Sequence, residues 1–120
     1  MLGSEFVRAG VAMHHEVHAV AREDCDITNR EAVFLLVDKQ RPEAVIHCAA
    51  HTDVDDCEKN PNKAHLINAG GASNFAEATK QIGGCFVYIS TSGVFDGNKT
   101  EAYVETDQPV PRTEYGRSKL

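Results

Sequence analysis

Residues 44–50 read Ala-Val-Ile-His-Cys-Ala-Ala, and residues 85–90 read Cys-Phe-Val-Tyr-Ile-Ser. Each stretch is short and nearly free of polar residues, which is typical of a parallel strand buried on both faces. We therefore predict two buried strands here. Helical patterns stand on either side of both, and this alternation predicts an α/β fold with a doubly wound parallel sheet.

Around these strands the sequence predicts four helices, one more strand and a long loop. Thr28 and Glu31 match a capping box, so we expect Thr28 to open a helix. Asn60 is expected to cap the next helix because proline follows it. The expected ranges are a helix over 2–13, an alternating strand over 16–21, a helix from Thr28 that stops before Pro42, a helix from Asn60 to about Gln81, a loop over 92–111 and a last helix from Thr113.

Composition limits the partners of this chain. It has 120 residues with a net charge of −6, and such an acidic chain has no overall field to attract nucleic acid or anionic lipid. No apolar run has the roughly 18 residues that a membrane span needs. The four cysteines form no Cys-x-x-Cys pair, so we expect reduced, mostly buried thiols in a cytoplasmic protein. We expect no metal site, because His14, His15 and His18 lack further ligands at a suitable spacing.

The order of elements indicates an incomplete domain. In a nucleotide-binding α/β sheet the first strand lies between the second and the fourth, and no segment here supplies it. We interpret residues 1–120 as a partial dinucleotide-binding domain of a longer protein, or as a gene model that starts late, with the substrate domain outside this chain. We expect the segment alone to be inactive.

Three polar residues in the second half of the chain have the chemistry of a proton-transfer site. Tyr115 and Lys119 are four positions apart, so on a helix they share one face. A nearby cation favours the phenolate, which makes a phenol a usable proton donor near neutral pH. Thr91 follows a buried strand, where open α/β sheets place their ligands. The alternatives are a surface Tyr/Lys pair and a turn-forming threonine. His47, within its strand, is interpreted as a hydrogen-bonded core residue.

A series of ordered motifs resembles the extended short-chain dehydrogenase/reductase family, and within it the dTDP-4-dehydrorhamnose reductase branch. The two most specific motifs are Tyr-Val-Glu-Thr-Asp-Gln-Pro-Val-Pro (103–111) and Tyr-Gly-Arg-Ser-Lys-Leu (115–120). The supporting motifs are Met-Leu-Gly-Ser-Glu (1–5), Asp-Ile-Thr (26–28), Arg-Pro-Glu-Ala-Val-Ile-His-Cys-Ala-Ala-His-Thr (41–52), Ile-Asn-Ala (67–69) and Ile-Ser-Thr-Ser-Gly-Val-Phe-Asp-Gly (89–97).

This resemblance implies an NAD(P)-binding Rossmann fold that uses NADPH or NADH to reduce a 4-keto nucleotide sugar. It implies a catalytic trio, in which Tyr115 gives a proton, Lys119 holds the nicotinamide ribose and Thr91 orients the substrate carbonyl. Thr91 and Ser92 are the implied substrate contacts, and a homodimer is left open. The implied cofactor-binding residues are Leu2, Gly3, Arg22, Asp26, Ile27, Ala49, Ala50, His51, Thr52, Ile89, Tyr115 and Lys119.

Two points stay open at the level of sequence. Arg22 favours NADPH, whereas the adjacent Glu23 and Asp24 favour NADH, and we lean towards NADPH. The pair Ser92-Gly93 replaces the Asp-Tyr usual in the family, which leaves the sugar uncertain. The alternative functions are a non-catalytic NADP-binding subunit, similar to the beta subunit of methionine adenosyltransferase, and an inactive segment.

Overall fold

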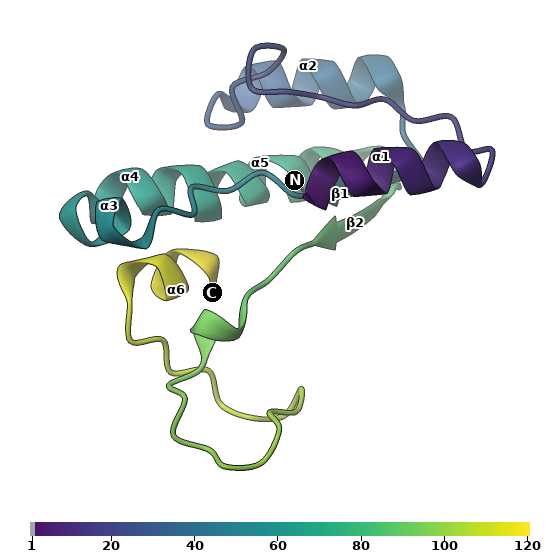
Figure 1. Ribbon diagram of the computed structural model, residues 1–120. Helices are drawn as coiled ribbons and strands as arrows, with labels where there is room; N and C mark the ends of the chain where they lie inside the picture. The colour runs from purple at the N-terminus through teal and green to yellow at the C-terminus, as the bar shows by residue number, and fades with distance from the viewer. Residues whose placement is uncertain (1) are drawn as a thin grey trace.

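Two parallel strands, β1 (Ala44–His47) and β2 (Cys85–Tyr88), form the sheet of the computed structural model, which describes residues 2–120. Ala44 lies opposite Cys85, and His47 lies opposite Tyr88. The predicted parallel pairing is therefore confirmed. Both strands are shorter than the predicted ranges, because after β2 the chain leaves the sheet and runs towards the last helix (Figure 1).

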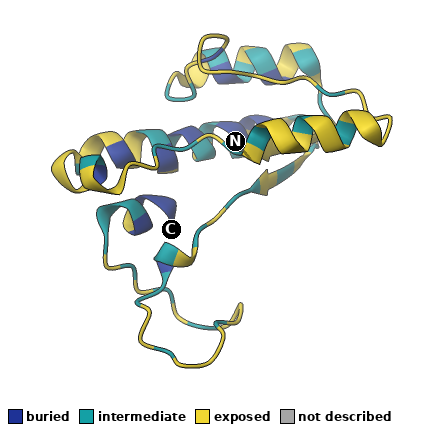
Figure 2. Ribbon diagram, in the orientation of Figure 1, coloured by how far each residue is buried: buried dark blue, intermediate teal, exposed yellow. Residues whose placement is uncertain are grey.

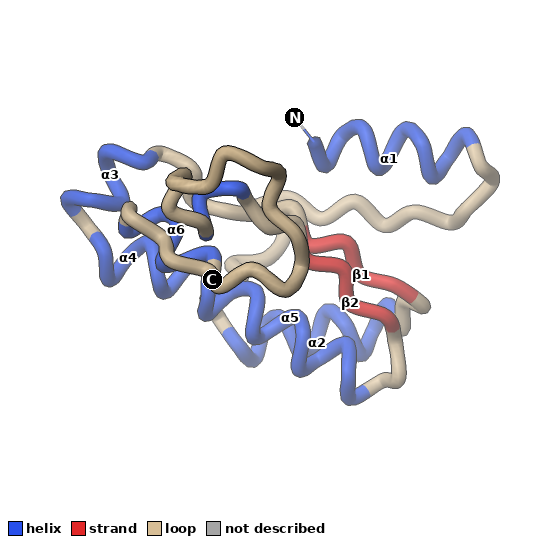
Figure 3. Tube along the Cα trace, turned by 90° about the horizontal axis from the view of Figure 1, so that it is seen from below, coloured by secondary structure: helices blue, strands red, loops and turns tan. Residues whose placement is uncertain are grey.

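Helices α2 (Arg30–Gln40) and α5 (Gly71–Gln81) pack together on one side of the sheet (Figure 3). Their contact contains most of the buried apolar side chains, among them Val33, Val37 and Phe75. No helix within residues 2–120 is both long and apolar enough to cross a bilayer. The other elements are α1 (Leu2–Ala12), α3 (Val54–Lys59), α4 (Pro61–His65), a π-helical segment (Leu66–Gly70), a 3-10 turn (Ser92–Val94) and α6 (Glu114–Lys119).

The opposite face of the sheet is open. Ile46 and Val87 on this face are 45% and 40% exposed, so the prediction of strands buried on both faces is wrong for the described residues. Helix α1 lies on this side, but none of its residues is buried (Figures 2 and 3). All four cysteines are free thiols; Cys25 and Cys57 are buried as expected, whereas Cys85 is exposed.

Two local predictions near α2 are wrong. Residues 16–21 form no strand, because no described strand runs beside them to complete a ladder. Thr28 does not cap α2: its hydroxyl donates to Asp26 at 2.8 Å, and Asn29 caps the helix by accepting from the Ala32 N–H at 3.1 Å. Asn29 stands directly before the first helical residue, which is the position where an N-cap acts.

The predicted helix from Asn60 to Gln81 exists as three joined pieces, α4, the π-helical segment and α5. Pro61 occupies the first helical turn, but Asn60 makes no side-chain capping bond there; its amide donates to Asp56 instead. After α5 the chain turns at Gly83, whose φ of 77° suits glycine. Helix α3 was not predicted, because its six residues are too few for a periodic pattern.

Candidate active site

Side chains from two segments hold the first turn of α6, the helix that carries the predicted catalytic pair. The Thr113 hydroxyl accepts from the Gly116 N–H at 3.0 Å, which confirms the predicted helix start. A carboxylate oxygen of Glu58 on α3 accepts from the Glu114 N–H at 2.7 Å. Helix α6 has only six residues, so these contacts rather than its own hydrogen bonds fix its position.

Gly116 brings α6 close to the segment that contains Thr91. A Cβ atom on Gly116 would overlap the carbonyl oxygen of Gly93 and lie 3.0 Å from Cβ of Pro111. Thr91 caps the 3-10 turn, since its hydroxyl oxygen accepts from the Gly93 N–H at 3.1 Å. The turn role considered for Thr91 is therefore real, and it leaves the hydroxyl proton free to donate to a ligand.

Lys119 is 5% exposed, an unusual burial for a lysine. Its ammonium nitrogen lies 3.9 Å from the centre of the Tyr88 ring on β2. We find no hydrogen bond or ion pair of this ammonium among the described residues. Burial lowers the pKa of Lys119, although the Cys48 thiol acts in the opposite direction.

Tyr88 interacts with both residues of the predicted catalytic pair, Lys119 and Tyr115. Burial raises the pKa of Tyr88, and the charge of the Tyr115 phenolate raises it further. The structure therefore brings Tyr115 and Lys119 to the same strand end and sets Thr91 in the neighbouring turn. A phenol, an ammonium and a hydroxyl gathered there can bind and protonate a carbonyl oxygen.

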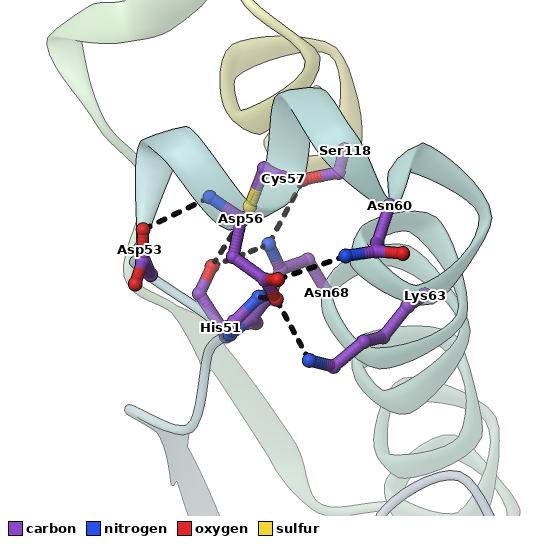
Figure 4. Close-up of polar contacts among 8 residues, drawn as sticks. All are labelled: His51, Asp53, Asp56, Cys57, Asn60, Lys63, Asn68 and Ser118. Carbon is purple, nitrogen blue, oxygen red and sulfur yellow. Dashed lines mark hydrogen bonds and ion pairs between the residues drawn. The ribbon is translucent and has the colours of Figure 1, made fainter.

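The buried side-chain amide of Asn68 links α6 to the loop that follows β1 (Figure 4). Asn68, fully buried in the π-helical segment, accepts from the His51 N–H at 2.7 Å and donates to the His51 carbonyl at 3.0 Å. The same amide donates to the Ser118 hydroxyl at 2.8 Å, and that hydroxyl donates to the Tyr115 carbonyl at 2.8 Å. One side chain thus fixes the strand-end loop and α6 relative to each other.

The ring of His51 points to the acidic helix α3 (Figure 4). Its Nε2 lies 2.6 Å from a carboxylate oxygen of Asp56, which also accepts from the Lys63 ammonium at 2.7 Å. Hydrogen bonds from Lys63, Asn60 and His51 lower the pKa of Asp56 to about 2. The ring of His51 is thus held by α3. The structure shows no metal-binding cluster in the described part of the chain.

The start of α1 lies at the same end of the sheet. A Cβ on Gly3 would be 3.7 Å from Cβ of Cys48, the residue directly after β1. The other predicted cofactor contacts of these segments, and the predicted substrate contact Ser92, are near in sequence to these residues. Leu2 is exposed beside Gly3; Ala49, Ala50 and Thr52 follow Cys48 in the same loop; Ile89 follows β2 and is half-buried; Ser92 is exposed in the 3-10 turn.

Three predicted residues lie on the connection between α1 and α2. Asp26 accepts hydrogen bonds from the Thr28 N–H and hydroxyl, and these bonds, with a smaller effect of Arg22, lower its pKa. Ile27 packs on the core, and its carbonyl accepts from the Asn74 amide at 2.9 Å. Arg22 is exposed. No hydrogen bond or ion pair joins these residues to α6 within residues 2–120.

Sequence reasoning missed Tyr88, Ser118 and Asn68 as parts of this site. The sequence pattern marks Tyr88 only as an apolar strand residue, and Ser118 only as a spacer within the Tyr-x-x-x-Lys motif. Asn68 carried a usable signal, since a polar residue in a buried helix needs partners. His47 is buried as expected, but its Nε2 has no hydrogen-bond partner, because the rings of Phe75, Phe86 and Tyr88 surround it.

The fold and the site define a Rossmann-type α/β domain with the tyrosine–lysine helix of short-chain dehydrogenases/reductases. The family model described as the RmlD substrate binding domain matches residues 1–120, and the chain belongs to this family. Similar proteins include dTDP-4-dehydrorhamnose reductase of Burkholderia thailandensis, 38% identical over 119 residues, or 99% of this chain and 40% of that protein. The chain therefore spans about two fifths of such relatives.

Solved structures confirm the predicted fold and family resemblance. A dTDP-4-dehydrorhamnose reductase of Clostridium acetobutylicum is 41% identical, with a TM-score of 0.95 over 98% of this chain and 42% of that one. The Bacillus anthracis enzyme, solved in complex with NADP, is 42% identical, with a TM-score of 0.87 over 90% of this chain and 39% of that one.

Proposed function

We propose that this chain carries the cofactor-binding and proton-donating part of an NADPH-dependent reductase. The substrate is a 4-keto nucleotide sugar of the dTDP-4-dehydrorhamnose type, and the product is a dTDP-deoxysugar precursor of cell-surface polysaccharide. The relatives named above carry this activity in their names. Free thiols fit a reducing compartment, so we place the reaction in the cytoplasm.

The observation that carries this proposal is the buried Lys119 ammonium at the ends of the parallel strands. Lys119 is 5% exposed as a residue, and its ammonium has donors that an acceptor on a ligand can satisfy. The two hydroxyls of a nicotinamide ribose are acceptors of a suitable kind. Gly3 also fits a dinucleotide, because a glycine at a helix start near the strand end lets backbone N–H groups approach a pyrophosphate.

Each residue of the site then has a separate task. The bound NADPH supplies a hydride to the sugar carbonyl carbon. Tyr115 donates its phenolic proton to the carbonyl oxygen, and Thr91 donates a hydrogen bond to that oxygen while its own oxygen stays fixed by Gly93. Lys119 binds the ribose. The loop of Ala49, Ala50, His51 and Thr52 borders the cofactor, and Leu2, Asp26, Ile27, Ile89 and Ser92 complete the proposed contacts.

The preference for NADPH over NADH rests on Arg22. It is exposed on the connection where the family places the adenosine ribose, and a guanidinium matches a 2′-phosphate better than a hydroxyl. Two related enzymes were solved with NADP or NADPH. Arg22→Ala should therefore raise the KM for NADPH and leave the KM for NADH nearly unchanged.

The test of the proposed function uses the full-length protein that contains this chain. It is incubated with NADPH and dTDP-4-dehydrorhamnose, and nicotinamide absorbance is followed while calorimetry measures NADPH binding. We expect both binding and turnover. NADPH binding without turnover of any related keto sugar would favour the non-catalytic subunit. Absence of NADPH binding would overturn the proposal.

A further inference from the structure

Tyr88 is the one aromatic residue of β2 whose ring faces the ammonium of Lys119, a buried residue. It ends the strand and lies opposite His47 in the sheet. Lys119, which is 31 positions later by its number, reaches over this ring from α6, with its nitrogen 3.9 Å from the ring centre. This distance is well within the roughly 6 Å over which a ring face attracts a cation.

No carboxylate balances the charge of Lys119 among the described residues. The titratable groups around it are His47 and Cys48 from the β1 segment and Tyr88 from β2, and Tyr115 from its own helix acts on Tyr88. Burial, with a smaller effect of Lys119, lowers the pKa of His47 to about 4, and burial raises the pKa of Cys48. Both groups are therefore neutral near pH 7, and the Tyr88 ring face is the available electron-rich partner.

A ring face and a carboxylate differ in how many N–H groups of the ammonium stay free to donate. A carboxylate would take one or two N–H groups of the ammonium in directed hydrogen bonds. A ring attracts the ammonium through its quadrupole, so the charge is stabilised while N–H groups stay free to donate. A lysine that must bind ribose hydroxyls needs such a partner.

We propose that Tyr88 is a positioning residue, whose ring holds the Lys119 ammonium at the strand ends with its N–H groups free for a cofactor. The part of this proposal that concerns the cofactor rests on the proposed function. The ring is the active feature and the phenolic hydroxyl is dispensable. Phenylalanine at position 88 should therefore still hold the Lys119 ammonium, whereas an aliphatic residue should not.

The first experiment measures Lys119 in the full-length protein without any cofactor. Acetic anhydride labels amines only when they are deprotonated, and mass spectrometry gives the labelling of Lys119 as a function of pH. We expect Tyr88→Phe to keep the wild-type midpoint and Tyr88→Leu to lower it by about one pH unit. Equal midpoints in the two variants, or a higher midpoint in Tyr88→Leu, would overturn the proposal.

A matched control is Phe86→Leu, which removes a ring from the same face of β2 two residues before Tyr88. It should leave the Lys119 midpoint unchanged. Circular dichroism checks folding, and if Tyr88→Leu does not fold, Tyr88→Met takes its place, because methionine fills irregular space well. The outcomes given for Tyr88→Leu then apply to Tyr88→Met.

The second experiment measures NADPH affinity by calorimetry. We expect roughly tenfold weaker binding in Tyr88→Leu and less than a twofold change in Tyr88→Phe and Phe86→Leu. Equal weakening in Tyr88→Leu and Phe86→Leu would overturn the specific role of Tyr88. If the wild type binds no NADPH, the proposed function fails, and the labelling experiment still decides whether Tyr88 positions Lys119.

Discussion

The side-chain amide of Asn68 donates a hydrogen bond of 2.8 Å to the hydroxyl of Ser118, which lies 50 positions further along the chain. Asn68 is completely buried, and Ser118 is 1% exposed. Because Asn68 also pairs with both backbone groups of His51, this contact links the loop after β1 to the helix that carries Tyr115. This buried side chain therefore adds to the Thr113 and Glu58 contacts that position α6.

We expect Asn68→Ala to reduce the free energy of unfolding by about 2–4 kcal/mol, because buried partners lose their hydrogen bonds and each unpaired group costs about 1–3 kcal/mol. Urea unfolding of the full-length protein measures the change. Asn62→Ala is the matched control, since Asn62 is exposed on α4 and should change stability by less than about 0.5 kcal/mol. Equal effects of the two substitutions would contradict a structural role of the Asn68 amide.

We expect His47 to make the protein less stable as the pH falls from 6.5 towards 4. Its pKa is lowered from 6.5 to about 4, by burial first and then by Lys119. Between these values the unfolded chain binds a proton that the folded protein does not, so falling pH favours unfolding. The loss should reach about 2 kcal/mol near pH 5.

The comparison protein for this prediction is His47→Leu, in which no group titrates at this position. Leucine suits the site because three aromatic rings surround His47 and its Nε2 has no partner. The difference in unfolding free energy between wild type and His47→Leu should therefore change with pH between about 6.5 and 4. A difference independent of pH would show that His47 titrates normally.

Hydrophobic patterns predicted most of the fold, because helix and strand periods are local properties of the sequence. The parallel pairing and the helices of 2–13, of the segment before Pro42 and of the C-terminus are all present. The failures share a physical cause. Strand 16–21 and burial of Ile46 both require neighbours on the far side of β1, and the described residues do not provide them.

Residues of the candidate site could be predicted where a local motif and its spacing define their position. Tyr115 and Lys119 share α6, and Thr91 lies in the turn that Gly116 approaches. Tyr88 and Asn68 could not be assigned from spacing, because their roles arise from contacts between distant segments. Such contacts appear only when the fold places the Lys119 side chain of α6 over the ring of Tyr88 and packs the π-helical segment against α6.

Tyr115→Phe should lower kcat by about 10²–10⁴ in the full-length protein while NADPH affinity stays within a few fold. The phenol acts only when the carbonyl oxygen gains charge, so its loss removes a transition-state interaction. Steady-state kinetics and calorimetry measure the two quantities. Tyr103→Phe is the control, since Tyr103 lies in the loop before α6 and donates to Asp96 at 3.0 Å. An unchanged kcat in Tyr115→Phe would remove this residue from the mechanism.

Gly116→Ala should affect both stability and turnover, because the new methyl group has no space. It would overlap the Gly93 carbonyl oxygen, meet Cβ of Pro111 at 3.0 Å and meet the Gly93 carbonyl carbon at 3.1 Å, and two of these three atoms belong to the backbone. Backbone cannot move aside as a flexible side chain does, so α6 and the Thr91 turn must separate. We expect a loss of about 1–3 kcal/mol in stability and roughly 10²-fold in kcat/KM.

The control Gly70→Ala separates the steric effect of the new methyl group from the effect of alanine on helix propensity. Gly70 is helical, and a Cβ there would meet only Leu66 and the His65 carbonyl, at 3.8 and 3.9 Å. Gly70→Ala should therefore leave kcat/KM unchanged and stabilise the helix by up to about 1 kcal/mol. Thermal unfolding and steady-state kinetics of both variants give the comparison. If Gly116→Ala kept full activity, α6 and the Thr91 turn would not need their close contact, and the site would tolerate a wider separation of Tyr115 from Thr91.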